Sequence, residues 1–284
     1  MASVDKKDIQ IGKFNTLSVV KILDFGCYLD GGTAGEILLP RRYVPTDVQL
    51  GDDINVFIYF DSEDRLVATT DTPRALVGQV AYLRVSQVGS PGAFLDWGLP
   101  KDLLVPRSQQ RTPMIEGHSY VVYVYRDIAT GRIAASSKFS RFVDNVMPRY
   151  AVGDKVSAIV TDITPLGYKV IIENQHTAIL YRNEVFTPLS VGQSIVAYVK
   201  KVREDDLIDL SLTPLGYAKV ADLAEAITSA LAQSGGFLPV GDHSDPEQIK
   251  TLFGCSKKSF KMTIGTLMRQ KQILITPDGI KLIK

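Results

Sequence analysis

The sequence predicts a mainly β protein with a C-terminal α+β domain: three tandem five-stranded barrels followed by a winged helix-turn-helix. Three observations lead to this fold class. A motif of two short strands bent around a glycine occurs three times along the chain. The glycine spacings are the same in every copy, and the apolar periodicity changes from strand-like to helical near residue 218.

The repeated motif is clearest at residues 91–106, where Phe94 and Leu95 precede a glycine-bearing corner and the apolar run 103–105 follows it. Related runs occur at residues 25–40 and 166–181. Each copy also begins with a glycine and has another 39 residues later: Gly12 and Gly51, Gly78 and Gly117, Gly153 and Gly192. Equal spacings beside strand-like runs predict three homologous modules.

Each module contains five short apolar runs and no long helical pattern, which is typical of a small closed barrel. In the first module, residues 54–60 alternate as a half-buried strand should. Residues 140–147 are expected to form a short helical linker that Pro148 ends. The expected domains are residues 1–74, 75–148 (with the linker), 149–217 and 218–284.

The last segment has a helical period, because Leu223, Ile227 and Leu231 fall on one face of a helix that Gly235 and Gly236 end. Asp245 before Pro246 is a start signal for a second helix, and Ser256 can cap a third. Residues 273–275 and 280–282 then flank a Pro-Asp-Gly turn. Three helices and a hairpin predict a winged helix-turn-helix.

The chain has 284 residues and a formal net charge of +1, with 45% hydrophobic and 22% charged residues. The four expected domains carry net charges of −4, +3, −1 and +3. A polyanion should therefore favour the second module and the C-terminal domain.

The cysteines indicate a reducing, cytoplasmic location, because Cys27 and Cys255 lie in different modules without CxxC spacing. Residues 1–8 lack the apolar core of a signal peptide. No run approaches the ~18 apolar residues of a membrane helix. We therefore expect neither a leader nor a membrane partner.

Catalytic motifs are absent from the sequence. His118, His176 and His243 lie in three different modules, and no metal-ligand spacing, phosphate loop or hydrolase signature occurs. We therefore expect no enzymatic activity, cofactor, metal or small-molecule substrate.

The runs 25–30 and 36–40, together with residues 209–212, resemble the S1-type RNA-binding repeat, an OB-fold. Three such repeats before a winged helix carrying the run 256–261 are similar to the bacterial conserved virulence factor B family over nearly the whole chain. The resemblance implies a non-catalytic, RNA-binding regulator of gene expression, including that of virulence factors.

The resemblance also implies an RNA face in each repeat, with two rings on the second strand, one on the third and an Asp…Arg pair before the fifth. The first module keeps Phe25, Tyr28, Asp61 and Arg65, and the second keeps Phe94, Asp127 and Arg132. The third has Leu166 and Lys169 at the paired ring positions, Tyr181 on the third strand with Arg182 beside it, and no matching arginine. Strand alternation leaves open whether the rings stack on bases or lie in the core. Trp97 can likewise stack on a base or cover the barrel end.

In the winged helix, Lys257, Lys258 and Lys261 crowd the first turn of the third helix, where the helix dipole disfavours cations. A phosphate partner would offset this cost, and a solvated face is the alternative. The expected partner is RNA, preferably single-stranded, with DNA as the second candidate. Two alternatives are a DNA-binding transcription regulator and a protein-interaction scaffold whose barrels have lost their ligands.

Overall fold

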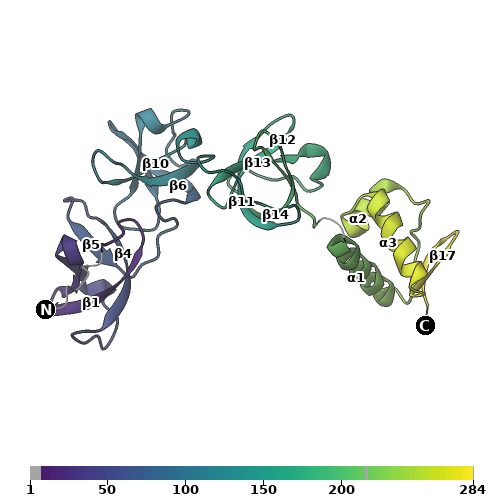
Figure 1. Ribbon diagram of the computed structural model, residues 1–284, viewed down its shortest axis with the longest axis horizontal. Helices are drawn as coiled ribbons and strands as arrows, with labels where there is room; N and C mark the ends of the chain where they lie inside the picture. The colour runs from purple at the N-terminus through teal and green to yellow at the C-terminus, as the bar shows by residue number, and fades with distance from the viewer. Residues whose placement is uncertain (1–7, 215–216, 284) are drawn as a thin grey trace.

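Three barrels follow one another along the chain, and a small helical domain carries the C-terminus (Figure 1). The computed structural model describes residues 8–214 and 217–283, so the expectation of no leader, which rests on residues 1–8, falls almost wholly outside it. The first barrel closes in the order β1-β2-β3-β5-β4. Its strands are β1 (Phe14–Leu23), β2 (Gly26–Asp30), β3 (Glu36–Pro40), β4 (Asp53–Phe60) and β5 (Leu66–Thr69).

The second and third barrels repeat this order of strands. The second is a sheet in the order β10-β9-β6-β7-β8 whose edge strands β8 and β10 lie against each other, and the third is closed. The strands of the second are β6 (Val80–Val88), β7 (Gly92–Asp96), β8 (Leu103–Pro106), β9 (Ser119–Arg126) and β10 (Ile133–Ser136). Those of the third are β11 (Lys155–Ile163), β12 (Gly167–Ile172), β13 (His176–Tyr181), β14 (Ser194–Val202) and β15 (Ile208–Ser211).

The equal glycine spacing has a structural cause. All six glycines have φ between 80° and 97°, a left-handed conformation that side chains other than glycine rarely adopt. The first glycine of each pair donates its amide to the fourth strand, at the carbonyl oxygens of Ile58, Val124 and Val199. The second donates to the first strand, at those of Val19, Val85 and Val160. The spacing therefore marks the same two turns in every barrel, and the prediction of three tandem barrels is confirmed.

The first two barrels share an apolar core. Phe57 and Tyr59 point out of the first barrel and are buried in one cluster with Trp97 of the second, which contacts the Phe57 ring. Strand β4 is consequently buried on both faces from Val56 to Tyr59, so the expectation of a half-buried strand was wrong there. Trp97 does not stack on a ligand, because it is only 3% exposed and its indole Nε1 donates to the Lys101 carbonyl at 2.6 Å.

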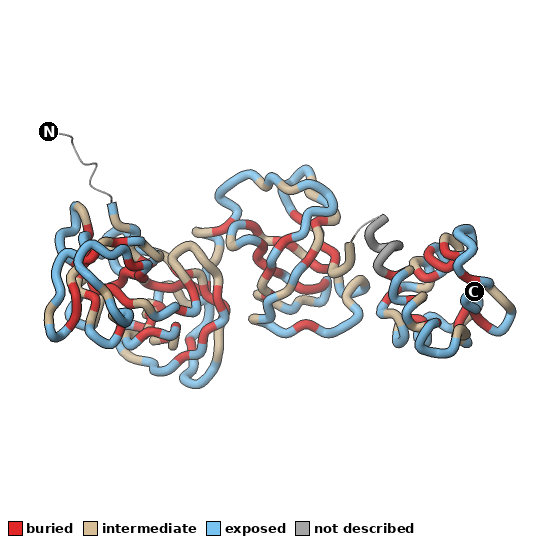
Figure 2. The backbone as a smooth tube through the Cα atoms, turned by 90° about the horizontal axis from the view of Figure 1, so that it is seen from below, coloured by how far each residue is buried: buried red, intermediate tan, exposed pale blue. Residues whose placement is uncertain are grey.

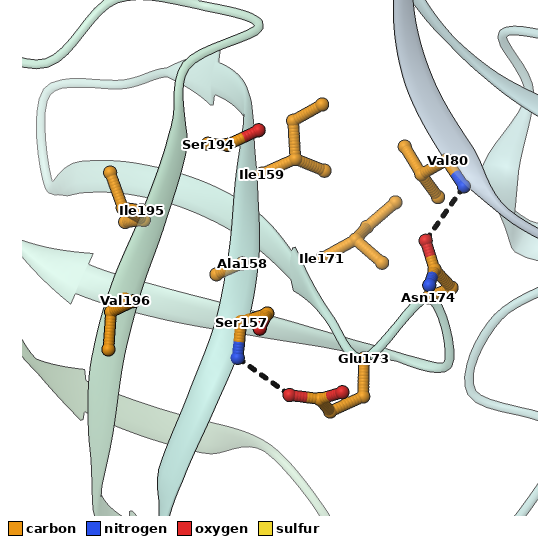
Figure 3. A pocket seen from close by; sticks show the side chains of 10 residues that line it. All are labelled: Val80, Ser157, Ala158, Ile159, Ile171, Glu173, Asn174, Ser194, Ile195 and Val196. Carbon is orange, nitrogen blue, oxygen red and sulfur yellow. Dashed lines mark hydrogen bonds between the residues drawn. The ribbon is translucent and has the colours of Figure 1, made fainter. Parts of the chain in front are cut away.

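Polar contacts join the second barrel to the third. The Val80 amide donates to Asn174 Oδ1 at 2.8 Å, and the Arg111 guanidinium pairs with both carboxylate oxygens of Asp162 at 2.9 and 2.5 Å. Figure 3 shows the groove of about 340 Å³ that lies beside the Val80–Asn174 bond. Its walls come mostly from β11 and β14, and none of the predicted site residues lines it.

The predicted helical linker is not a helix. Only a 3-10 turn, Phe139–Arg141, forms in this region. Asp144 has a φ of 61° and accepts hydrogen bonds from the Thr177 amide and hydroxyl, each at 2.7 Å. The segment is thus bound to the third barrel, and the left-handed backbone at Asp144 does not fit a continuous right-handed helix.

The C-terminal domain contains the three predicted helices, α1 (Tyr217–Gln233), α2 (Pro246–Phe253) and α3 (Lys257–Arg269), and the predicted hairpin of β17 (Ile273–Thr276) and β18 (Gly279–Leu282). Asp245 and Ser256 cap α2 and α3 as expected. A short strand, β16 (Phe237–Leu238), joins the hairpin and was not predicted. Figure 2 shows buried residues, in red, within this domain and along the barrels. No helix within the described ranges has the length and apolarity needed to cross a membrane.

Candidate nucleic-acid interface

Every barrel has a close approach between its second and third strands. A Cβ added at Gly26, Gly92 or Gly167 would lie 2.1–2.3 Å from a carbonyl oxygen of the third strand, so only glycine fits. At the same place, an arginine amide donates to the carbonyl of the residue before the glycine, from Arg41 to Phe25, Arg107 to Pro91 and Arg182 to Leu166. An arginine therefore starts the 3-10 turn beside the ring positions in all three barrels.

In the first barrel the two predicted rings are outside the core. Phe25 is 56% exposed, and Tyr28 is half-buried with its ring centroid 6.4 Å from that of Phe25 and the planes at 89°. The Lys21 ammonium lies 5.7 Å from the Tyr28 ring centroid. This surface combines an exposed ring with a nearby cation, as stacking on a base beside a phosphate requires.

Arg65 forms the predicted pair with Asp61, at 2.7 Å, and also contacts Glu63 at 2.9 Å. Partial burial would raise the pKa of Asp61, but hydrogen bonds from the Arg65 amide and guanidinium outweigh it and hold the pKa below its ordinary value. The Arg65 side chain is 65% exposed, so a phosphate can reach it.

In the second barrel Phe94 is half-buried beside Gly89 and Pro91. The predicted pair of Asp127 and Arg132 does not form between side chains. The Asp127 carboxylate accepts from Thr130 at 2.8 Å, and Arg132 instead pairs with Asp64 of the first barrel. Arg132 thus contributes to the contact between barrels.

In the third barrel Tyr181 is half-buried on the outer face with Ile179, whereas Leu180 between them is fully buried. Lys169 is exposed on β12 and pairs in register with Ile179. Arg182 donates to the Thr164 carbonyl at 2.8 Å and lies 5.9 Å from the Tyr168 ring centroid. Tyr181 is therefore outside the core, with both basic residues nearby on the same barrel.

One arginine beside Tyr181 was not predicted from the sequence. Arg203 binds Asp209 and the Tyr181 hydroxyl. Arg41 and Arg107 were missed as well, although a signal exists in the sequence. An arginine follows the third apolar run of every module, directly at Arg182 and after one proline at Arg41 and Arg107.

In the winged helix, Lys257, Lys258 and Lys261 lie in the first turns of α3, behind the Ser256 cap. Lys261 is 3.8 Å from Asp242. No acidic side chain of the described residues lies within 4.0 Å of Lys257 or Lys258. Their charge is thus unbalanced at a helix end that already attracts anions.

Neither the cysteines nor the histidines form a reactive cluster. Cys27 and Cys255 are buried in two different cores. His176 is buried between the Tyr150 hydroxyl, at 2.9 Å, and the Val146 carbonyl, at 2.7 Å. Across residues 8–214 and 217–283 there is no group of three His, Cys, Asp or Glu side chains placed to hold a metal.

Comparisons with known proteins agree with this architecture. Residues 11–71 match the family model described as S1 domain, and residues 225–282 match the CvfB-like winged helix domain. The chain is similar to conserved virulence factor B of Staphylococcus aureus (strain USA300), with 26% identity over 98% of this chain and 95% of that protein. It is also similar to uncharacterized protein YitL of Bacillus subtilis (strain 168), with 28% identity over 92% and 90% of the two chains.

Among solved structures, the crystal structure of a multidomain protein with nucleic acid binding domains from Streptococcus pneumoniae TIGR4 is similar at 27% identity. It covers 96% of this chain and 98% of that one, with a TM-score of 0.40.

The protein is thus of the class that joins tandem OB-fold barrels, the first of them an S1 domain, to a winged helix, and S1 and winged helix domains are two kinds of nucleic-acid-binding domain. The predicted resemblance to the conserved virulence factor B family is confirmed.

Proposed function

We propose that the protein is a non-catalytic RNA-binding regulator that holds single-stranded RNA on the outer faces of its barrels and on α3. The observation that carries this proposal is the exposed Phe25 ring beside Tyr28, Lys21 and Arg41, at a position that all three barrels build in the same way. The domains that would act together are residues 1–74, 75–148, 149–217 and 218–284.

The physical basis is stacking combined with phosphate neutralisation. A base stacked on a protein ring contributes ~1–3 kcal/mol, and each single-strand phosphate neutralised adds about −0.7 to the slope of log K against log salt. No barrel has a full set of rings, so each binds weakly alone. Several barrels on one strand raise the effective concentration and multiply affinity by ~10²–10⁴.

A regulator of transcripts would act after transcription and in the cytoplasm. Cys27 and Cys255 form no disulfide and are buried in separate cores, which fits a reducing compartment. A role in virulence is suggested by the name of the Staphylococcus aureus relative and is part of the same proposal.

The deciding experiment compares the affinity of the full chain for a single-stranded RNA, a duplex RNA and a duplex DNA of the same sequence, each at several salt concentrations. We expect the single-stranded RNA to bind most tightly with a clear salt dependence. Tighter binding of duplex DNA would instead favour a transcription regulator that uses the winged helix. Binding to none of the three would favour a protein-interaction scaffold.

A further inference from the structure

The residue directly after the fourth strand is an aspartate in the first two barrels and an arginine in the third. Directly after the fourth strand, Asp61 and Asp127 donate their backbone amides to the carbonyls of Arg65 and Arg132, at 3.0 and 2.8 Å. The equivalent amide in the third barrel belongs to Arg203 and donates to the Leu207 carbonyl at 2.8 Å. A guanidinium therefore occupies the place of a carboxylate.

Two neighbouring positions change together with it. The last residue of the third strand is Pro40 or Pro106 in the first two barrels and Tyr181 in the third. The second residue of the fifth strand is Val67 or Ala134 in the first two and Asp209 in the third. The third barrel thus has a tyrosine, an arginine and an aspartate where the others have a proline, an aspartate and an apolar residue.

These three side chains form one hydrogen-bonded unit. Arg203 donates from Nη2 and Nε to the two carboxylate oxygens of Asp209, at 2.6 and 3.2 Å, and Nη2 also contacts the Tyr181 hydroxyl. The hydroxyl in turn donates to Asp209 Oδ1 at 3.4 Å. The Arg203 and Asp209 side chains are 31% and 13% exposed, so water screens the pair only partly.

The unit limits what the Tyr181 ring can do. Because its hydroxyl is engaged on both sides, the phenol cannot read the edge of a base, and the ring face remains for contact. A ring anchored at its far end loses little further freedom when a base stacks on it. By contrast, the exposed Phe25 ring has no polar atom that could anchor it.

We propose that Arg203 and Asp209 are positioning residues that hold the Tyr181 ring ready to stack with one base of a single-stranded RNA. This inference rests on the proposed function. It makes the third barrel the preorganised stacking site of the chain, with Lys169 on the neighbouring strand available to a phosphate. Recognition there depends on the ring face and tolerates any base.

The test measures the affinity of the full chain for a fluorescently labelled single-stranded oligouridine, using Tyr181→Phe, Arg203→Lys and the double variant. Tyr181→Phe keeps the ring and removes the hydroxyl that anchors it. Arg203→Lys keeps the positive charge and removes the guanidinium that contacts both Asp209 and the Tyr181 hydroxyl. We expect each single change to weaken binding about three- to ten-fold, a part of the stacking contribution. The double variant should be no weaker than the worse single variant, since both changes break the same anchor.

Arg65→Lys is the matched control, because Arg65 pairs with Asp61 and Glu63 in the first barrel. In the double variant of Arg65→Lys and Tyr181→Phe, the fold-losses of affinity of the two single variants should multiply, because the sites are independent. Thermal unfolding of each variant checks that the fold is kept, and Tyr181→Phe alone decides the matter if Arg203→Lys unfolds.

Wild-type affinity in Tyr181→Phe, together with weak binding by Tyr181→Ala, would overturn the anchoring and leave the stacking intact. Multiplying losses for Tyr181→Phe and Arg203→Lys would show instead that Arg203 contacts the RNA directly. Failure of the unaltered chain to bind any single-stranded RNA would remove the proposed function itself.

Discussion

Trp97 of the second barrel packs edge-on against Phe57 of the first, with ring centroids 5.7 Å apart and planes at 78°. Both side chains are buried, at 3% and 0% exposure. The chain contains a single tryptophan, so tryptophan fluorescence reports on this contact between barrels.

Phe57→Ala should lower the free energy of unfolding by ~3–5 kcal/mol, as expected for a large buried ring. The measurement is denaturant unfolding followed by tryptophan fluorescence and by circular dichroism. Because the first two barrels share a core, we expect fluorescence and circular dichroism to report the same decrease in the free energy of unfolding. Phe25→Ala removes an exposed ring and is the control, with an expected change of about 0.5 kcal/mol or less. Equal stabilities for the two variants would contradict a shared core.

A second prediction concerns acid stability at the same contact. The hydrogen bond from Arg74 to the Asp96 carboxylate, opposed by partial burial, holds the pKa of Asp96 below its ordinary value. A lowered folded pKa stabilises the protein above the unfolded value of about 3.9, and this stabilisation is lost as the pH falls through the folded pKa. Stability should therefore fall with pH below about 4.

Asp96→Asn should flatten that fall, as should Arg74→Gln, which removes the cause of the shift. Urea unfolding of the three proteins across a series of acid pH values makes the comparison. The prediction is wrong if the pH dependence is the same with and without the carboxylate.

The fold was largely predictable because the signals that define it are local. Positive-φ glycines recur at fixed spacing, and Asp245 and Ser256 cap helices by bonds to residues two or three positions away. Contacts between barrels were not predictable in this way. The apolar run 54–60 suits a strand buried on one face or on both, and only the position of Trp97 decides between these.

The candidate site was predicted less completely, for a related reason. Phe25, Tyr28 and Tyr181 could be named by position in the repeat, and all three lie outside the core. Arg203 could not, because the repeat pattern places an arginine after an aspartate, whereas in the third barrel Arg203 precedes Asp209. Arg132 has the right position in the sequence, but Asp64 of the neighbouring barrel binds it. Which side chains pair depends on how neighbouring barrels pack, and the repeat pattern does not predict that packing.

The lysines of α3 give a third prediction. Lys257→Ala and Lys258→Ala should each weaken RNA binding about equally for different sequences and lower the salt slope by about 0.7. Lys261→Ala should have a smaller effect, since Asp242 lies 3.8 Å from its ammonium. Lys13→Ala, an exposed lysine of the first barrel, is the control. Binding isotherms at several salt concentrations give the slopes, and an unchanged slope in the double variant of Lys257 and Lys258 would return these lysines to a solvated surface.

The last prediction places the main footprint on residues 149–284, with help from the second barrel. The first barrel has the better ring pair but a net charge of −4, whereas the C-terminal domain has +3. Repulsion from its acidic residues opposes the stacking of Phe25 and Tyr28. A fragment of residues 1–74 cannot test this, because it would expose Phe57 and Tyr59, which the second barrel covers. Single changes in the full chain avoid that difficulty.

We expect Tyr181→Ala to cost ~1–3 kcal/mol of affinity for single-stranded RNA and Phe25→Ala to cost about 1 kcal/mol or less at low salt. The difference between the affinity losses of the two variants should become smaller at higher salt, because salt screens the acidic residues of the first barrel. Thermal unfolding measured beside binding separates lost affinity from lost fold, which matters most for the half-buried Tyr181. A larger loss from Phe25→Ala than from Tyr181→Ala at every salt concentration would move the footprint to the first barrel, because stacking there would then outweigh the repulsion.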